Sequence, residues 1–164
     1  MLDSLYDVAV AMGAPGRGIL AADESTGTIK KRFDSIDAES TEDSRRDYRE
    51  MLFRAPEMGD HISGVILFDE TLRQKAADGT PLVDLITAAG SIPGIKVDKG
   101  AHALAGADGE TVTEGLDGLR ARLEEYHALG ARFAKWRAVI NIDEHGTPSQ
   151  YGIKANTHAL ARYA

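Results

Sequence analysis

Charged side chains stand at or near the ends of three short apolar runs of the sequence. Asp23 follows the first of these runs, and Lys96 and Asp98 end the third. Lys135 and Arg137 belong to the fourth run. If the runs are parallel strands, their carboxyl ends share one face of the fold and the charges converge there. The lysines and the arginine would then form an electropositive pocket for an anionic substrate, most simply a phosphorylated one.

Clustered cations also favour the neutral amine of a lysine. A neutral amine can attack a carbonyl group and form an iminium, while Asp23 balances charge or moves protons. Packing does not explain such a cluster, because burial of an unpaired ammonium group is costly. The alternative interpretation is that the lysines are solvated strand ends, each paired with Asp23 or Asp98.

The apolar runs have the length and composition of β-strands. They predict strands over residues 18–22, 62–68, 92–97 and 132–140. The second run is apolar at consecutive positions, which indicates burial on both faces. Because side chains alternate along a strand, Lys135 and Arg137 are expected on one side of the fourth strand and Trp136 on the other. The same alternation pairs Lys96 with Asp98.

Amphipathic segments alternate with these strands. They predict helices over residues 5–12, 41–54, 82–89, 115–129 and 149–164. Thr41 suits the N-cap of the second helix. The apolar face of that helix is expected to carry Tyr48, Met51 and Leu52. Pro81 suits the first position of the third helix.

Strands that alternate with helices imply right-handed βαβ units and a parallel sheet. Two α/β architectures fit this pattern: an open doubly wound sheet, or part of a (β/α)8 TIM-type barrel. A complete barrel needs about 250 residues. Because the 164 residues end in a predicted helix that carries Leu160 and Tyr163, we expect an incomplete domain. Residues 1–164 would supply the N-terminal half of a single barrel, about the first four βα units.

The composition limits the partners. A net charge of −7 argues against bulk attraction to nucleic acid or anionic lipid, so that any anion site must be local. The absence of cysteine excludes disulfides and thiolate nucleophiles. The N-terminus lacks the features of a signal peptide, and the longest strongly apolar runs are only strand-length. We therefore expect a cytoplasmic protein with no membrane and no nucleic-acid partner.

The remaining motifs give weaker signals. Residues 16–18 form a lone G-x-G that precedes a strand, which favours a turn over a dinucleotide-binding loop. Residues 100–112 form a long loop, either a lid or a plain excursion. The histidines lack metal-ligand spacing, which leaves no predicted metal or other cofactor. They are His61, His102, His127, His145 and His158.

At these residues the sequence resembles class I fructose-bisphosphate aldolase. The matching stretches, in order, are GRGILAADESTGTIKKRF, ISGVILFDETL, PGIKVDKG, TEGLDGL and GARFAKWRAVI. The resemblance extends from the first predicted helix to Ala164 but covers only about the first half of a family member. It implies reversible cleavage of fructose 1,6-bisphosphate to dihydroxyacetone phosphate and glyceraldehyde 3-phosphate, in glycolysis and gluconeogenesis, through a lysine Schiff base.

The resemblance also implies roles for individual residues. Asp23 would lie beside the reacting carbon and assist proton transfer around the carbinolamine, and Lys96 would contact the substrate. Lys135 and Arg137 would bind a substrate hydroxyl and phosphate and polarise the bond that breaks. Three further positions match residues that line the path by which a substrate phosphate enters the site, here called the phosphate approach. They are Ser25, Lys31 and Arg32.

The Schiff-base lysine of the family lies on a later strand that these residues do not include. The same holds for the glutamate acid/base and for the serine and arginine that bind the other phosphate. We therefore expect this polypeptide to be inactive alone. Family members are usually homotetramers. Two alternatives stay open: another phosphosugar lyase or isomerase on the same barrel, and a non-catalytic module that binds anions or a partner.

Overall fold

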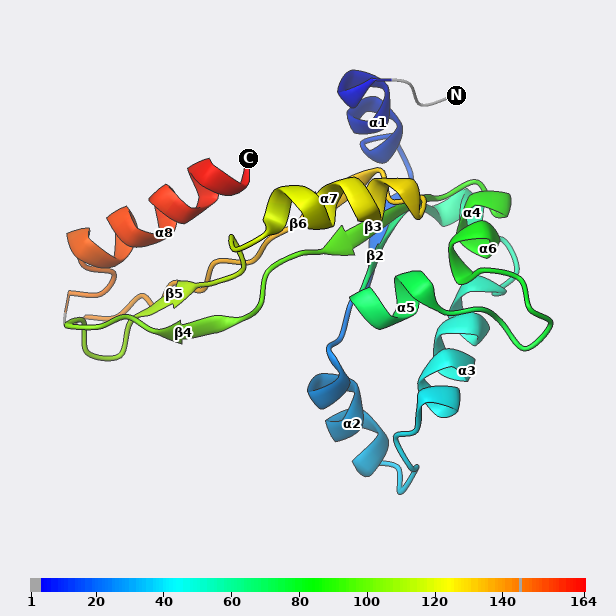
Figure 1. Cartoon of the computed structure of the whole chain (residues 1–164), viewed down its shortest axis with the longest axis horizontal. Helices are drawn as coiled ribbons and strands as arrows, with labels where there is room; N and C mark the ends of the chain where they lie inside the picture. The colour runs from blue at the N-terminus through cyan, green and yellow to red at the C-terminus, as the bar shows by residue number, and fades with distance from the viewer. Residues whose placement is uncertain (1–3, 145) are drawn as a thin grey trace. The chain divides into compact units, whose positions relative to one another are not determined.

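A computed structural model describes residues 4–144 and 146–164, in which helices alternate with strands (Figure 1). His145, which was not expected to be a metal ligand, and the first three residues of the chain lie outside the described residues. The chain divides into two units. The first comprises the residues up to Lys96 together with Glu125–Ala134, and the second comprises Val97–Glu124 and Lys135–Ala164.

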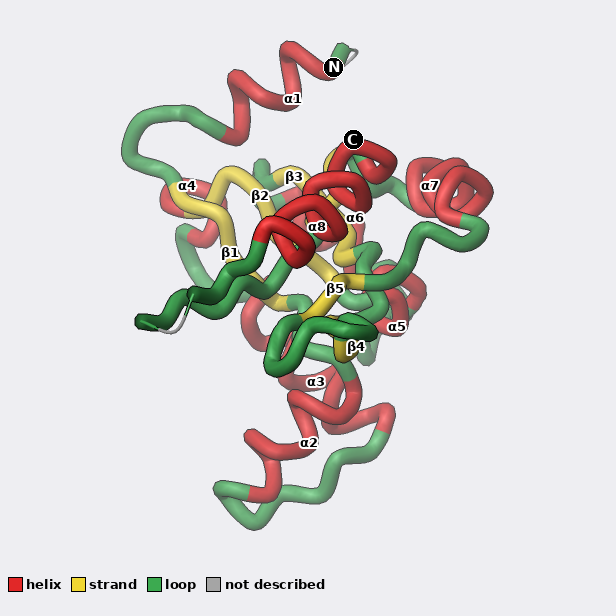
Figure 2. The backbone as a smooth tube through the Cα atoms, turned by 90° about the vertical axis from the view of Figure 1, so that its left-hand side faces the viewer, coloured by secondary structure: helices red, strands yellow, loops and turns green. Residues whose placement is uncertain are grey.

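The first unit is built on parallel strands, as the sequence predicted. They are β1 (Gly18–Ala22), β2 (Ile62–Leu67) and β3 (Ile92–Lys96), and β6 (Phe133–Lys135) follows β3 in the sheet order. The strands β1, β2 and β3 run side by side in Figure 2. Beside them, the N–H of Arg132 donates to the carbonyl of Pro93 at 2.8 Å and leads the chain into β6.

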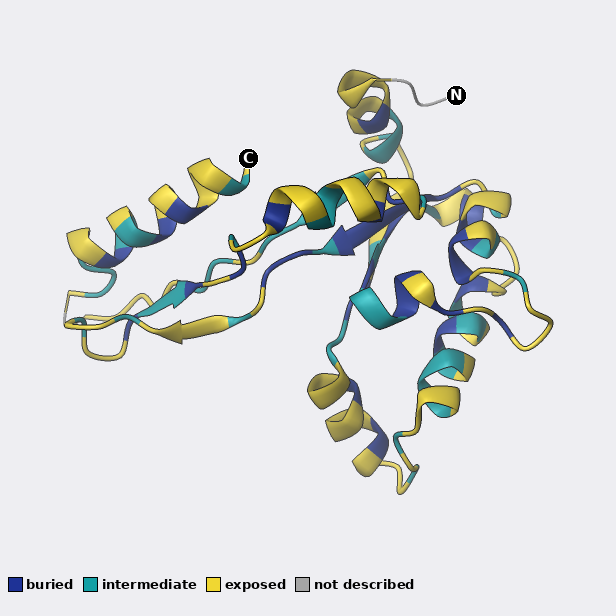
Figure 3. Cartoon of the chain, viewed as in Figure 1, coloured by how far each residue is buried: buried dark blue, intermediate teal, exposed yellow. Residues whose placement is uncertain are grey.

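No residue of the middle strands, both fully described, is exposed, as predicted for the second strand, although Ile62 and Ile66 on one face of β2 are only half-buried (Figure 3). Val65 and Leu67 on β2 are fully buried. On one face the ring of Phe133 lies over glycines of two strands: a Cβ atom at Gly94 would stand 2.3 Å from that ring, and one at Gly64 would stand 3.1 Å from it. The glycines therefore make room for the aromatic side chain.

Helices of the first unit connect or precede these strands. They are α1 (Leu5–Met12), α2 (Thr26–Asp34), α3 (Glu42–Phe53), α4 (Met58–His61), α5 (Asp69–Arg73) and α6 (Leu82–Ala88). The predicted cap of α3 is confirmed. Thr41 Oγ1 accepts the N–H of Ser44 at 3.0 Å, and Ser44 Oγ accepts the N–H of Thr41 at 2.9 Å, which makes a reciprocal capping box.

Two details of the predicted helices are wrong. Met51 is 61% exposed, and the face of α3 that packs inward carries Arg49 and Phe53 instead. Pro81 is the N-cap of α6 and not its first helical residue, because its ψ of 135° is extended. Its carbonyl already accepts the N–H of Asp84 at 3.0 Å, as an N-cap carbonyl does.

The second unit contains a hairpin where the sequence predicted only a loop. Strands β4 (Ala101–Ala103) and β5 (Thr111–Thr113) pair antiparallel, with Ala101 opposite Thr113. Helix α8 (Gln150–Tyr163) packs on β5 and starts at the N-cap Ser149, as expected. The two are tied by the side chain of Asn156, which donates to the carbonyl of Thr111 at 2.8 Å.

Two predicted elements are longer than the observed ones by more than two residues. Helix α7 (Leu119–Ala128) starts four residues late, because Gly115 and Gly118 have φ values of +129° and +63° that a helix cannot contain. The fourth strand stops at Lys135, and residues 136–144 are irregular. Among the described residues, no helix is both long and apolar enough to cross a membrane.

Candidate active site

Asp23 and Lys96 stand at the same edge of the parallel sheet. Ala22 is in register with Leu67 and Leu67 with Ile95, so the next residues along β1 and β3, Asp23 and Lys96, are level with each other. Adjacent strands lie about 4.8 Å apart, which separates the two backbones by about 10 Å with β2 between them. Asp23 is 9% exposed, whereas Lys96 is half-buried. The first unit thus brings an acid and a cation together at the carboxyl ends of its strands.

The turn after β1 leads directly into α2. Ser25 is the N-cap of that helix, and its hydroxyl lies 3.1 Å from the hydroxyl of Thr28. Lys31 and Arg32 lie in the last turn of α2 and are exposed. Helical side chains lean toward the N-terminus, and Arg32 reaches back to form an ion pair with Glu24 in the turn itself. Ser25 and Arg32 are therefore brought toward one turn, although seven positions separate them.

The group behind that turn was not predicted from the sequence. Glu24 is bound on its inner side by Arg49 of α3, which is 2% exposed. The signal was present in the helical period: Arg49 precedes Phe53 by four positions and therefore shares its face. The assignment of the apolar face to Tyr48 and Met51 concealed it.

The second unit positions Lys135 and Arg137. Lys135 is the last residue of β6, and its carbonyl accepts the N–H of Val97 at 3.0 Å. Arg137 lies beyond the strand and is exposed, and its expected placement on the same side as Lys135 stays a prediction. Its backbone is held instead by two side chains. Thr113 Oγ1 donates to its carbonyl at 2.8 Å, and Asp98 Oδ2 accepts its N–H at 3.3 Å.

Asp98 is a buried acid that contacts the backbone of Gly100 and of Arg137 and lies near Tyr163. It lies past the end of β3, and its predicted pairing with Lys96 stays a prediction. Its Oδ1 atom accepts the N–H of Gly100 at 3.2 Å. Burial raises the pKa of Tyr163, and the negative charge of Asp98 adds to this effect. The ring of Tyr163 packs against Trp136 with centroids 5.4 Å apart. An acid, two aromatic rings and the Lys135–Arg137 segment thus form one cluster.

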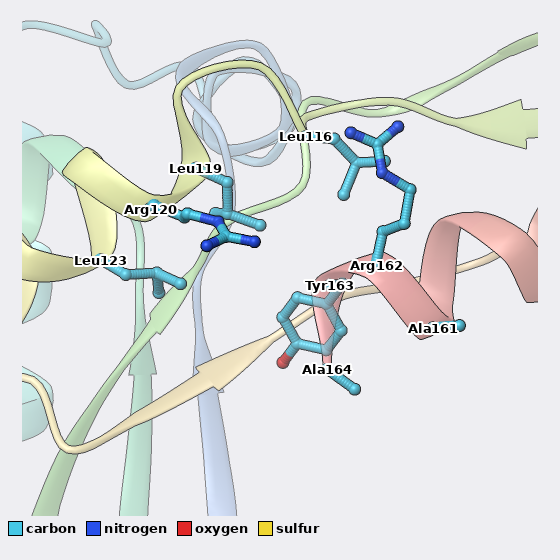
Figure 4. Close-up of a pocket in the computed structure, with 8 residues that line it drawn as sticks. All are labelled: Leu116, Leu119, Arg120, Leu123, Ala161, Arg162, Tyr163 and Ala164. Atoms are coloured by element: carbon cyan, nitrogen blue, oxygen red, sulfur yellow. The ribbon is translucent and has the colours of Figure 1, made fainter.

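A cavity of about 500 Å³ in the second unit is separate from the predicted site residues, none of which lines it. Figure 4 shows the guanidinium of Arg120 directed from α7 toward the ring of Tyr163 on α8. The lining residues are Leu116, Leu119, Arg120, Leu123, Ala161, Arg162, Tyr163 and Ala164.

Within each unit, the geometry fits chemistry on an anionic carbonyl compound. The first unit offers a buried acid level with a lysine, and the second offers a lysine and an arginine on a braced segment. An acid can move protons, while cations bind phosphate and polarise a carbonyl or hydroxyl oxygen.

Comparison with known proteins identifies a family for this arrangement. The family model described as "Glycolytic: Fructose-bisphosphate aldolase class-I" matches residues 4–164. A probable fructose-bisphosphate aldolase class 1 of Xanthomonas axonopodis is 64% identical over 163 residues, which are 99% of this chain and 48% of that protein. The cytosolic fructose-bisphosphate aldolase 6 of Arabidopsis thaliana is 57% identical, over 99% of this chain and 45% of the relative.

The similarity extends to a solved structure. A fructose-bisphosphate aldolase from Plasmodium falciparum, crystallised with TRAP and a small-molecule inhibitor, matches with a TM-score of 0.94 and 51% identity. The match covers 96% of this chain and 46% of the other. The chain thus spans about half the length of these relatives. Its βα units correspond to part of a TIM-type barrel and not to an open doubly wound sheet. The chain therefore belongs to the class I fructose-bisphosphate aldolase family.

Proposed function

We propose that this chain supplies the first half of the active site of a fructose-bisphosphate aldolase. The reaction is the reversible cleavage of fructose 1,6-bisphosphate to dihydroxyacetone phosphate and glyceraldehyde 3-phosphate, a step of glycolysis and gluconeogenesis, through a lysine Schiff base. The observation that carries the proposal is the register of the sheet, which sets buried Asp23 level with Lys96 at the carboxyl edge. Membership of the family supports the same chemistry.

In this mechanism Asp23 moves protons at the carbinolamine. A carboxylate can take a proton from the attacking nitrogen and give it to the departing hydroxyl, which then leaves as water, and it can return both protons in the reverse step. Burial keeps it out of bulk water. Lys96, at the same edge, contacts the substrate and keeps the acid in a cationic environment.

Lys135 and Arg137 act on the sugar itself. Lys135 binds a substrate hydroxyl and polarises the carbon–carbon bond that breaks, and Arg137 binds a phosphate oxygen. The backbone brace that Asp98 and Thr113 provide at Arg137 supports this role, because it fixes the segment that carries both cations. No cofactor enters the proposal.

The phosphate approach is assigned to Ser25, Lys31 and Arg32 on the turn after β1 and on α2. A hydroxyl, an ammonium and a guanidinium are suitable donors to a phosphate, and the guanidinium can bind two oxygens at once. The return of Arg32 toward the turn that carries Ser25 supports this grouping.

The nucleophilic lysine that forms the Schiff base belongs to the other half of the barrel in this proposal. The 164-residue polypeptide by itself therefore does not turn over substrate. The complete enzyme is a homotetramer in the cytoplasm. Two relatives, from Arabidopsis thaliana and Pisum sativum, carry "cytosolic" or "cytoplasmic" in their names, which supports the location.

A comparison of two polypeptides tests the proposal. One is the 164-residue chain, and the other continues it with the second half of the Xanthomonas axonopodis relative. We expect the chimera to cleave fructose 1,6-bisphosphate and, with borohydride, to trap one dihydroxyacetone phosphate adduct per chain, whereas the shorter polypeptide does neither. A folded chimera without cleavage or adduct contradicts the proposed reaction. Turnover by the shorter polypeptide contradicts the assignment of the nucleophile.

A further inference from the structure

Arg49 is a buried arginine that no step of the proposed reaction uses. It lies on α3 with 2% of its surface exposed, and its Nη1 atom donates to Glu24 Oε2 at 2.5 Å. Its Nη2 atom donates to the carbonyl of Glu24 at 3.2 Å. The guanidinium also lies 5.4 Å from the ring centroid of Tyr48. Its Nε atom is buried and has no partner among the described residues.

Glu24 is shared between two guanidinium groups. Its Oε2 atom binds Arg49, while its Oε1 atom binds Arg32 of α2. The side chain of Glu24 is only 8% exposed, whereas that of Arg32 is 59% exposed. The triad therefore has a buried end and a solvent-facing end, and its formal charge is +1.

Stability alone is a poor reason for such a triad. Replacement of a buried ion pair by apolar side chains is often neutral or stabilising, because desolvation offsets the Coulombic attraction. The orphaned Nε atom adds a further desolvation cost. The arrangement suits an electrostatic role better than a structural one.

The net charge of the Arg32–Glu24 pair explains the presence of the second arginine, Arg49. Glu24 fixes the flexible Arg32 side chain against the turn, but a simple Arg32–Glu24 pair is neutral and attracts an anion weakly. Arg49 approaches the same carboxylate from the buried side and offsets its charge. Arg32 can then be held in place and still act as a cation.

We propose that Arg49 is a positioning residue that keeps the Glu24–Arg32 pair cationic, so that Arg32 is both anchored and able to bind a substrate phosphate. This inference rests on the proposed role of Arg32 in the phosphate approach. Arg49 itself touches no substrate and acts through Glu24.

Titration of the 164-residue chain with inorganic phosphate, followed by NMR at low ionic strength, tests the inference. We expect Arg49→Met to weaken phosphate binding about fivefold. In a partly screened site, the interaction free energy between one positive charge and a nearby phosphate dianion is about 1 kcal/mol. Arg49→Lys keeps the charge and should retain binding within about twofold. The matched control is Arg46→Met on the same helix. The guanidinium of Arg46 pairs with Asp43 and Asp47 and, among the described residues, forms no ion pair with Glu24, so this variant should bind phosphate as the parent chain does.

The double variant Glu24→Gln/Arg49→Met separates charge from packing. It loses the same buried guanidinium as the single variant but restores the charge of the triad to +1. We therefore expect phosphate binding to return to within about twofold of the parent chain. It also leaves no buried charge without a partner, so it remains informative if Arg49→Met alone does not fold.

Two outcomes overturn the inference itself, and two others overturn the phosphate site on which it rests. Unchanged binding by folded Arg49→Met shows that the charge of Arg49 does not reach the anion. Binding by the double variant that stays as weak as in the single variant shows a purely structural role. If the parent chain binds no phosphate, or Arg32→Met binds as well as the parent, the phosphate site of the proposed function fails first.

Discussion

Asp98 accepts the backbone N–H of Arg137 at 3.3 Å, across 39 positions of sequence. The same carboxylate accepts the N–H of Gly100 at 3.2 Å. One buried acid thereby joins the turn after β3 to the segment that follows β6. The position of Arg137 depends on this junction, whereas Lys135 is held by β6.

Loss of the two hydrogen bonds that Asp98 accepts should affect both stability and catalysis. We expect Asp98→Ala to lower the free energy of unfolding by about 2 kcal/mol, because two backbone donors lose a charged acceptor. In the chimera it should also reduce kcat/KM by more than tenfold. Chemical denaturation and steady-state kinetics measure the two effects, with exposed Asp117→Ala as the control. Equal behaviour of the two variants would show that the junction is dispensable.

Glu110 should hold α8 to the hairpin. Its buried carboxylate accepts the N–H of Ser149 at 2.9 Å and the hydroxyl of Ser149 at 2.5 Å. We expect Glu110→Ala to destabilise the chain by about 2 kcal/mol and to speed hydrogen exchange along α8. Glu114→Ala, on an exposed acid near the same hairpin, should change neither. Unaltered exchange in Glu110→Ala would assign the docking of α8 to its other contacts.

Gly94 should tolerate no side chain. A Cβ atom there would stand 2.3 Å from the ring of Phe133, so Gly94→Ala is expected to cost about 1–3 kcal/mol through overpacking. Adding Phe133→Leu should recover part of that loss. Gly27→Ala, where nothing lies within 4 Å, should be neutral or stabilising. Thermal unfolding of the variants measures these effects. A stability of Gly94→Ala equal to that of the parent chain would mean that the ring moves aside freely.

Asp78 gives a pH dependence with a definite sign. The backbone N–H of Thr80, its hydroxyl and Arg54 lower the pKa of Asp78 to about 2. The unfolded chain, with an ordinary carboxyl pKa, binds this proton more readily than the folded chain. The stabilisation is therefore present above pH 4 and is lost as the pH falls toward 2.

NMR titration of the Asp78 carboxyl carbon measures this pKa directly. Asp78→Asn should remove the corresponding part of the acid destabilisation between pH 4 and pH 2. Asp60→Asn provides an exposed control. A midpoint near pH 4 for Asp78 would contradict the hydrogen-bond assignment.

The sequence predicted the parallel strands well because their signal is local. The bounds of β1 agree with the prediction, and those of β2 and β3 agree within one residue. Helix α2 was missed even though Ile29 and Phe33 are both buried and lie four positions apart. The glycine and charged residues around them masked that spacing.

The errors arose where long-range contacts decide the structure. The predicted fourth strand continued to residue 140, but the backbone after Lys135 is held by hydroxyls of β5 and by Asp98. Strand alternation therefore could not place Arg137. Likewise, the pairing of Glu24 with Arg49 spans 25 positions and joins two different elements. A single segment does not reveal such partners.

The contribution of Asp23 to turnover in the chimera tests the central claim most directly. Proton transfer by a positioned side chain contributes about 10²–10⁴ to a rate. We therefore expect Asp23→Asn to lower kcat by at least about 100-fold with a smaller change in KM, while exposed Asp60→Asn leaves kcat unchanged. A folded Asp23→Asn chimera that retains kcat within about twofold would contradict the assignment of this strand edge as the catalytic site.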